Sequence, residues 1–308
     1  MPARIVAPTP AVLREAARIL RRGGLVAFPT ETVYGLGANA CDATAVEKIF
    51  IAKGRPASNP LIVHVASEAA ARSLARRWPE AAARLAAAHW PGPITLVVEK
   101  NDAIAELVCA GGPTVGLRVP AHPVARSLLR EAGLPLAAPS ANRSEEISPT
   151  TAQHVAESLG PFVDDLLILD GGPCLVGIES TVIDVTGDAP VVLRPGMARI
   201  STPAIPATLP PPIADASNAP ARSPGQAARH YAPRKSLVLI RRGDPAYERR
   251  QKDGLLTLPA TPEAAAALLY AELRRLDADA TIERIVVIDP PEHPAWDAIR
   301  DRLRRAGA

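Results

Sequence analysis

The chain has 308 residues, 47% of them apolar and 22% charged, a composition that excludes long disorder as the dominant state and suggests one large domain plus a smaller one. The net charge is only +3 without a basic tail, so charge selects neither a nucleic-acid nor a membrane partner. The three cysteines are widely spaced and no apolar run reaches the ~18 residues of a membrane span, so we expect a cytoplasmic protein without a disulfide framework or a membrane partner.

Helices and strands alternate along the first two hundred residues, which is typical of an α/β domain. Thr9 followed by Pro10 predicts a helix start, and Gly23 ends that helix. The short apolar segment Leu25–Phe28 ends at Pro29 and predicts a buried strand. Further strands are predicted at Leu61–Val65, Ile94–Glu99, Thr114–Val119, Leu136–Ala138, Leu166–Leu169, Thr181–Val185 and Val191–Leu193, and helices at Ala43–Lys53, within Ser67–Ala88, at Pro123–Glu131 and at Pro149–Ser158.

A proline-rich segment separates this domain from the end of the chain. Seven prolines fall within Ser201–Pro224, where little apolar periodicity is left, so we expect a semi-rigid linker. Beyond it, strands are predicted at Ser236–Ile240, Gly254–Leu258 and Arg284–Ile288, and helices at Pro262–Leu276 and Pro294–Arg305. We therefore expect a first domain at residues 1–200, a linker at 201–234 and a small α/β domain at 235–308.

Two loops carry groups that suit anionic ligands. Lys53 and Arg55 flank a glycine between a helix and a strand, which indicates either a ligand-binding loop or a solvated helix C-terminus. Ser140, Asn142 and Arg143 share one loop after a strand, where they could bind phosphate or ribose or simply form a turn.

A single arginine interrupts an apolar strand. A buried Arg118 needs an anionic partner, which is either an internal carboxylate or the carboxylate of a substrate. His64 poses the same choice between a core residue and a ligand contact. No P-loop, dinucleotide fingerprint, zinc-protease motif or nucleophile elbow occurs in the sequence. A site that is rich in Arg, Lys, Ser and Thr and lacks an activated nucleophile favours catalysis by positioning and charge stabilisation.

Taken together, eight segments in the same order resemble the YrdC-type synthase family. They are Pro29-Thr30-Glu31-Thr32-Val33-Tyr34-Gly35-Leu36-Gly37, Lys53-Gly54-Arg55-Pro56, Asn59-Pro60-Leu61, Trp90-Pro91-Gly92-Pro93, Thr114–Pro120, Ser140-Ala141-Asn142, Glu179-Ser180-Thr181 and Arg194-Pro195-Gly196. Ser223-Pro224-Gly225-Gln226, His230-Tyr231-Ala232-Pro233 and the small second domain resemble the long, two-domain form of threonylcarbamoyl-AMP synthase.

This resemblance implies an open, twisted α/β sheet with a positively charged cavity, followed by a small Rossmann-like domain. It implies a nucleotidyltransferase that forms threonylcarbamoyl-adenylate and pyrophosphate from L-threonine, bicarbonate and ATP, for modification of the tRNA adenosine next to the anticodon. Mg²⁺ would accompany ATP, with no ligand for it named by the sequence. The downstream partner would be the tRNA threonylcarbamoyl transferase machinery.

The resemblance also implies roles for individual residues. Lys53 and Arg55 would be catalytic, and Tyr231 would fold over the nucleotide as a lid. Contacts to L-threonine would come from Thr32, His64, Arg118, Ala138 and from Ser180 or Thr181. Contacts to ATP would come from Arg55, Asn59, Thr114, Ser140, Asn142, Ser148, Arg194 and Tyr231.

The sequence departs from the family pattern at two places. Glu145-Glu146 stands where the family usually has glycine, and Pro294-Ala295-Trp296 stands where a glycine-rich turn is usual. Two other functions stay open. One is an RNA-binding module of the same fold, whose binding would weaken steeply with salt. The other is a different carbamoyl or adenylyl transferase, although the zinc-finger and acylphosphatase segments of hydrogenase maturation proteins are absent from the sequence.

Overall fold

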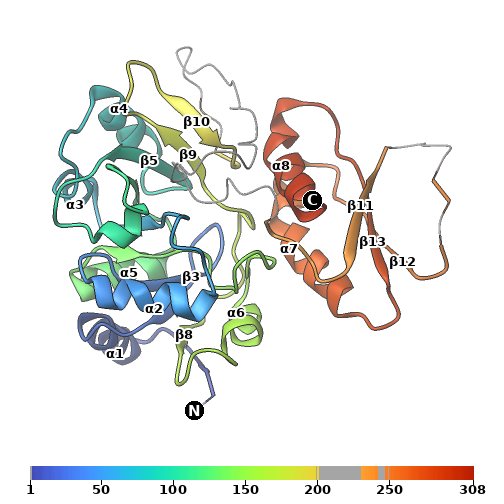
Figure 1. Cartoon of the computed structure of the whole chain (residues 1–308), viewed down its shortest axis with the longest axis horizontal. Coiled ribbons are helices and arrows are strands. Elements are labelled where there is room, and N and C mark those ends of the chain that lie inside the picture. The colour runs from blue at the N-terminus through green and yellow to red at the C-terminus, as the bar shows by residue number, and fades with distance from the viewer. Residues whose placement is uncertain (1, 199, 201–229, 242–246, 249) are drawn as a thin grey trace.

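The structure, a computed structural model, describes residues 2–198, 200, 230–241, 247–248 and 250–308. In this part of the chain a large mixed sheet is followed by a small parallel sheet, each with its own helices (Figure 1). The predicted α/β fold is confirmed. Most of the predicted linker, residues 201–229, lies outside the described residues. No helix of the described part combines the length and the apolar character that crossing a membrane requires.

The first sheet is built from short strands. They are β1 (Arg4–Val6), β2 (Val26–Phe28), β3 (Gly35–Asn39), β4 (Ile62–His64), β5 (Ile94–Glu99), β6 (Thr114–Arg118), β7 (Leu136–Ala137), β8 (Leu167–Leu169), β9 (Thr181–Asp184) and β10 (Val191–Arg194). In space the order of these described strands is β1-β8-β2-β3-β7-β4-β6-β5-β9-β10. The sheet is mixed, because it contains parallel pairs such as β4 with β6 and antiparallel pairs such as β5 with β6.

Six α-helices of the described part accompany this sheet, together with the 3₁₀ helix η1 (Glu106–Cys109). They are α1 (Pro10–Arg21), α2 (Ala43–Lys53), α3 (Glu68–Arg72), α4 (Glu80–His89), α5 (Pro123–Ala132) and α6 (Ala152–Leu159). Thr9 caps α1 as predicted, because its side chain accepts a hydrogen bond from the Val12 N–H. Gly54 ends α2 in the left-handed conformation, with φ of 59°.

Strand residues alternate between the two faces of the first sheet. On one face, Ala27, Val63 and Ile168 belong to a core completed by α2, α4 and α6. On the other face, Phe28 and Leu167 belong to a core completed by α1 and α5. Both faces of β2 and β8 are therefore buried, which explains why these strands read as continuous apolar runs.

Helices α1 and α5 cover only part of their face, the part formed by β2, β7 and β8. His64 pairs with Leu136 on β7 and with Arg118 on β6, so these side chains share that face. His64 and Arg118 lie outside the core that the two helices complete. The uncovered half of the face, over β4, β6, β5 and β9, is where polar side chains gather.

The second domain is a three-stranded parallel sheet with two long helices. Its elements are β11 (Ser236–Ile240), β12 (Asp253–Leu256), α7 (Pro262–Ala278), β13 (Arg284–Ile288), the 3₁₀ helix η2 (Pro294–Trp296) and α8 (Asp297–Ala306), with the strand order β11-β13-β12. Helices α7 and α8 lie between this sheet and the first domain (Figure 1). Leu269 and Leu273 of α7 share a core with Val33, Ile147 and Ile178 of the first domain.

The sequence does not predict β1 or β3. Strand β3 contains Gly35 and Gly37, a residue type that is depleted in strands. A Cβ atom at Gly37 would lie 2.8 Å from Cε1 of Phe28, so the aromatic ring on β2 requires glycine there. Strand β1 has only three residues and pairs at the sheet edge with β8, a long-range contact that no local pattern reveals.

Some predicted helices differ in their bounds. The stretch within Ser67–Ala88 divides into α3 and α4, and Pro79 is the residue before α4. The helix predicted at Pro149–Ser158 begins at Ala152, because the Thr151 side chain accepts a hydrogen bond from the His154 N–H. The helix predicted from Pro294 starts as the single turn η2 before α8.

Candidate active site

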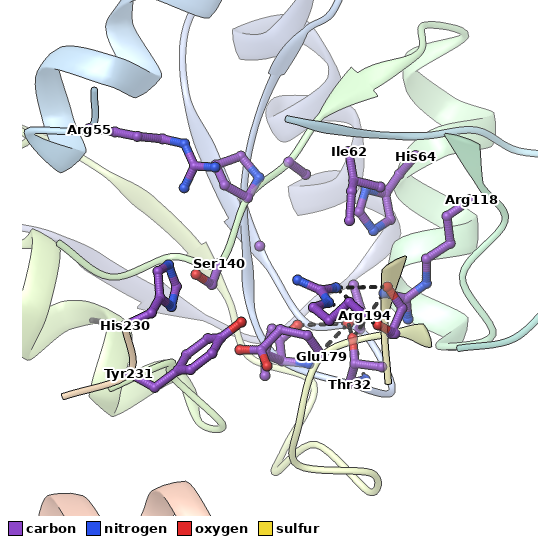
Figure 2. A pocket seen from close by; sticks show the side chains of 16 residues that line it. Thr32, Arg55, Ile62, His64, Arg118, Ser140, Glu179, Arg194, His230 and Tyr231 are labelled. Carbon is purple, nitrogen blue, oxygen red and sulfur yellow. Dashed lines mark hydrogen bonds between the residues drawn. The ribbon is translucent and has the colours of Figure 1, made fainter. Parts of the chain in front are cut away.

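The uncovered half of the sheet face carries a cavity, which we call the arginine pocket (Figure 2). Ile62 and His64 point into it from β4, two residues apart, while Val63 points into the opposite core. The enclosed space measures about 50 Å³, which holds only a few water molecules. The pocket is lined by Thr30, Thr32, Val33, Gly35, Arg55, Ile62, His64, Arg118, Ala138, Pro139, Ser140, Glu179, Ser180, Arg194, His230 and Tyr231.

One wall of the arginine pocket is the loop after β2. The hydroxyl of Thr30 orders this loop, because it accepts hydrogen bonds from the N–H groups of Thr32 and Val33 and donates to the Val33 carbonyl. The loop thereby presents Glu31 and Thr32 to Arg118. The Arg118 guanidinium donates to Glu31 Oε1 at 2.7 Å and to Thr32 Oγ1 at 3.0 Å.

The internal partner of Arg118 is therefore Glu31, one of the two possibilities that the sequence left open. Both side chains are buried. Burial on its own would raise the pKa of Glu31, but the Arg118 charge prevails and lowers it. Each terminal nitrogen of a guanidinium carries two hydrogens, so Arg118 keeps donor capacity for a second anion.

His64 is a neutral imidazole with unused hydrogen-bonding groups. Burial, reinforced by the Arg118 charge, holds its pKa well below the ordinary value of 6.5. Within the described residues, neither ring nitrogen has a hydrogen-bond partner. Buried polar atoms are normally paired, so a buried and unpartnered imidazole facing a cavity is typical of a ligand contact.

Two further guanidinium groups face the arginine pocket from opposite sides. Arg55 donates to the carbonyls of Asn59 at 3.1 Å and Pro60 at 2.8 Å. Arg194 donates to the Ser180 carbonyl from Nε at 3.1 Å and from Nη2 at 3.0 Å. Burial lowers the pKa of Arg55 to about 10, which leaves it protonated at neutral pH. Carbonyls carry no formal charge, so Arg55 remains a cation that can attract phosphate.

Lys53 serves the pocket indirectly. Its ammonium group donates to the carbonyl of Ser140 at 2.6 Å and to that of Asn142, so it joins the end of α2 to the loop after β7. Asn142 continues this support, because its side-chain amide donates to the carbonyls of Arg143 and Glu146. Burial and the nearby Arg55 lower the pKa of Lys53 well below its ordinary value. Lys53 thus sits behind the loop that carries Ser140.

His230 and Tyr231 close the pocket opposite His64 and Arg118 (Figure 2). The Tyr231 hydroxyl points inward, is buried and has no hydrogen-bond partner among the described residues. The backbone of this segment is held on both sides, by the bond from His230 N–H to the Arg305 carbonyl at 3.1 Å and from Ala232 N–H to the Glu145 carbonyl at 2.7 Å. Burial lowers the pKa of His230 to about 3, so the imidazole is neutral.

The structure brings most of the predicted site residues together. Predicted threonine contacts in the pocket lining are Thr32, His64, Arg118, Ala138 and Ser180, and predicted ATP contacts there are Arg55, Ser140, Arg194 and Tyr231. Their roles stay predictions.

Other predicted site residues lie outside this lining. Lys53 and Asn142 support the loop behind it, and Asn59 contributes its backbone carbonyl to Arg55. Ser148 donates to Glu179 at 2.6 Å. Thr114 begins β6, about 13 Å along the strand from Arg118 at ~3.3 Å per residue, and Thr181 lines a neighbouring cavity with Gly196.

Among the residues of the site that the sequence reasoning missed, three have ionisable side chains. Glu31 and Glu179 supply the carboxylates that pair with buried arginines, and His230 lines the pocket beside Tyr231. All three residues belong to the motif segments quoted in the sequence analysis. The role of the two acidic side chains becomes visible only when the structure shows the arginines that they contact. A requirement that every buried arginine have a carboxylate partner would have pointed to Glu31.

A mixed, twisted sheet with this pocket on its half-open face, followed by a small parallel domain, defines the YrdC-like class of α/β proteins. The family model described as "Telomere recombination", which covers Sua5, YciO and YrdC proteins, matches residues 18–196. The model of the threonylcarbamoyl-AMP synthase C-terminal domain matches residues 198–308.

Individual relatives agree with these matches. The threonylcarbamoyl-AMP synthase of Bacillus subtilis is 41% identical over 96% of this chain and 92% of its own. That of Pyrococcus abyssi is 45% identical over 74% of this chain and 67% of its own. The crystal structure of P. abyssi Sua5 complexed with L-threonine has a TM-score of 0.88 and 38% identity, over 99% of this chain and 96% of that one.

The chain therefore belongs to the threonylcarbamoyl-AMP synthase family, in its two-domain form. Membership confirms the predicted enzyme class, a nucleotidyltransferase that works in tRNA modification.

Proposed function

We propose that this chain joins L-threonine, bicarbonate and ATP into threonylcarbamoyl-adenylate and releases pyrophosphate. The observation that carries the proposal is the convergence of three guanidinium groups, Arg55, Arg118 and Arg194, with neutral hydroxyls and a neutral imidazole in one pocket. This set suits substrates that bring several negative charges, a carboxylate and a triphosphate. The L-threonine bound in the P. abyssi relative supports the same assignment.

We place the amino acid at the Arg118 end of the pocket. The remaining donors of Arg118 would bind the threonine carboxylate, while Thr32 and Ser180 offer hydroxyls for its polar groups. The unpartnered His64 imidazole would take a hydrogen bond from the substrate, since it has no partner among the described residues. Glu31 keeps Arg118 in place while the carboxylate enters and leaves.

The chemistry proceeds in two steps that need no enzyme nucleophile. Bicarbonate takes up a proton and loses water to give carbon dioxide, and the threonine amine adds to this carbon dioxide to give a carbamate and release a proton. A carbamate oxygen then attacks the α-phosphorus of ATP, and pyrophosphate leaves with the electron pair of the broken P–O bond. Arg55 and Arg194 would offset the charge that develops on the phosphates, so positioning and electrostatic stabilisation supply the rate.

Magnesium is proposed to arrive with ATP. Among the described residues, no group of three His, Cys, Asp or Glu side chains is placed to hold a metal ion. The carboxylate of Glu179, which faces the pocket, is committed to Arg302, Tyr270 and Ser148. These residues do not form a resident metal site, so the phosphate oxygens of the nucleotide would be the main ligands of Mg²⁺.

Substrate entry requires the Tyr231 wall to move. The enclosed space of about 50 Å³ is far below the ≈ 300 Å³ at which ligand pockets begin. Tyr231 has the left-handed φ of 62°, and the short backbone bridge between Glu146 and Ala232 holds it. We place the lid function on Tyr231, which would swing out to admit ATP and close over it. Unchanged kinetics in Tyr231→Ala would contradict this role.

The cellular setting follows from the product. An acyl-adenylate mixed anhydride is hydrolysed easily, so it must be passed directly to a transferase that modifies tRNA. We place the enzyme in the cytoplasm, where tRNA and the downstream threonylcarbamoyl transferase machinery meet it. Direct tRNA binding by this chain is not required.

The deciding experiment is pyrophosphate release from ATP with bicarbonate and Mg²⁺, with and without L-threonine. Release that depends on L-threonine and bicarbonate is expected, with L-serine as the control amino acid. A folded protein that binds ATP but shows no threonine dependence would contradict the proposed reaction.

A further inference from the structure

The second domain places a charged side chain against the back of the arginine pocket. Arg302, on α8, has a side chain that is 0% exposed. Its Nε donates to Glu179 Oε2 at 2.8 Å, and its Nη1 donates to the Pro195 carbonyl at 2.9 Å. Glu179 and Pro195 are the neighbours of Ser180 and Arg194, which line the pocket. Arg302 thus joins two pocket segments that come from different strands of the first domain.

Tyr270, on α7, makes a parallel set of contacts. Its hydroxyl donates to Glu179 Oε2 at 3.0 Å, and its ring stacks on Tyr231 with a centroid distance of 5.7 Å. The Arg302 guanidinium lies 5.4 Å from the centre of the same Tyr231 ring. Each of the two second-domain side chains therefore contacts both Glu179 and Tyr231.

Glu179 connects these contacts to the interior of the pocket. Its other oxygen accepts a hydrogen bond from Ser148 at 2.6 Å. The next residue, Ser180, accepts from Arg194 through its carbonyl and bonds to the Thr95 hydroxyl at 2.8 Å. A displacement of Glu179 would therefore move Ser180, the next residue in the chain, and with it Arg194, which is hydrogen-bonded to the Ser180 carbonyl.

The second domain is also held to the first by apolar packing. An apolar core shared by Leu269, Leu273, Val33, Ile147 and Ile178 already holds the two domains together. Replacing a buried ion pair by apolar side chains of similar volume is often neutral or stabilising, so a buried pair is poor evidence for stability alone. A fully bonded polar network instead selects one geometry of the groups that it contains.

We propose that Arg302 and Tyr270 are positioning residues of the active site, through which the second domain fixes Glu179 and the Tyr231 ring. The chemical role of the second domain is then to hold the nucleotide end of the pocket in its binding geometry. This inference rests on the proposed function, because it takes the Tyr231 end of the pocket as the nucleotide site.

The test compares ATP binding in Arg302→Met and Tyr270→Phe, measured by titration calorimetry with ATP on the full chain. Arg302→Met is expected to raise the Kd for ATP at least tenfold, and Tyr270→Phe, which keeps the stacked ring, at least threefold. In turnover, the KM for ATP should rise more than kcat falls. These effects should exceed what the melting temperatures of the variants explain.

Arg284→Met is the matched control. Arg284 forms an ion pair with Asp253 at 2.6 Å inside the second domain and has no contact with Glu179. The Arg284→Met substitution should lower the melting temperature and leave the Kd for ATP unchanged. If Arg284→Met raises that Kd as much as Arg302→Met, the second domain acts through its stability and the proposal is wrong.

Two further outcomes distinguish a failure of the positioning role from a failure of the proposed reaction. If Arg302→Met fails to fold, Tyr270→Phe decides, and a Kd equal to that of the unmodified chain would overturn the proposal. If the unmodified chain binds ATP without threonine-dependent pyrophosphate release, the proposed reaction fails while the Kd comparison still tests the positioning role.

Discussion

Breaking the buried pair of Glu31 and Arg118 should strongly destabilise the first domain, because it leaves a buried guanidinium without its counter-charge. The pair spans 2.7 Å, the two side chains are 10% and 4% exposed, and Glu31 Oε2 also accepts from the Ala121 N–H at 2.9 Å. Glu31→Gln removes the negative charge and places an amide donor against one of these donors. Breaking a buried pair in this way costs about 3 kcal/mol or more, which lowers the melting temperature of a domain of about 200 residues by roughly 6–12 °C.

Thermal unfolding followed by circular dichroism measures this effect. Glu68→Gln is the matched control, because it removes the same charge from an exposed pair with Arg72. An exposed pair of this kind contributes about 0.5 kcal/mol, so the melting temperature of Glu68→Gln should differ from that of the unmodified chain by roughly 1–2 °C. Equal shifts in the two variants would refute the reasoning that burial gives the Glu31 pair its weight.

Three further changes should each give a defined result. Gly37→Ala puts a Cβ 2.8 Å from the Phe28 ring and should cost about 1–3 kcal/mol in urea unfolding, whereas Gly187→Ala, with no atom closer than 4.0 Å, should be neutral. Glu145→Gly removes a left-handed φ of 69° and should stabilise the fold by up to about 1 kcal/mol; a loss would contradict strain there. Burial would raise the pKa of Glu179, but the charges of Arg302 and Arg194 outweigh it and lower this pKa from 4.5 to about 2. Its contribution is present above pH 4.5 and lost as the pH falls towards 2, so Glu179→Gln should flatten the acid limb of stability, and an unchanged limb would contradict it.

The sequence predicts those parts of the fold whose signals are local. The helix of α1 follows from Thr9 and Pro10, and the buried strand β2 follows from its short apolar run. Strand β3 is not predicted from the sequence, because the Phe28 ring on another strand requires glycine in it. This requirement appears only in three dimensions. The turn of η2 before α8 likewise depends on the His293 side chain, which accepts from the Ala295 N–H.

The residues of the candidate site are also only partly predictable from the sequence. Motif resemblance finds Arg118 and Tyr231, because they lie in distinctive segments of the chain. It does not find Arg302 or Tyr270, which reach Glu179 from helices more than ninety residues further along the sequence. A charged residue on an Arg-rich amphipathic helix looks like an ordinary solvated residue until the partner domain is placed beside it.

The geometry of the sheet fixes the spacing of the polar groups on its open half. Neighbouring strands repeat at about 5 Å, and side chains of one strand that share a face repeat at about 7 Å, so the polar groups on β4 and β6 occupy a fixed grid. One inserted residue in β4 would exchange the places of Val63 and His64 and bury an imidazole in the opposite core. Natural variation in this enzyme should therefore enter through loops and lid, while the length of β4 stays constant.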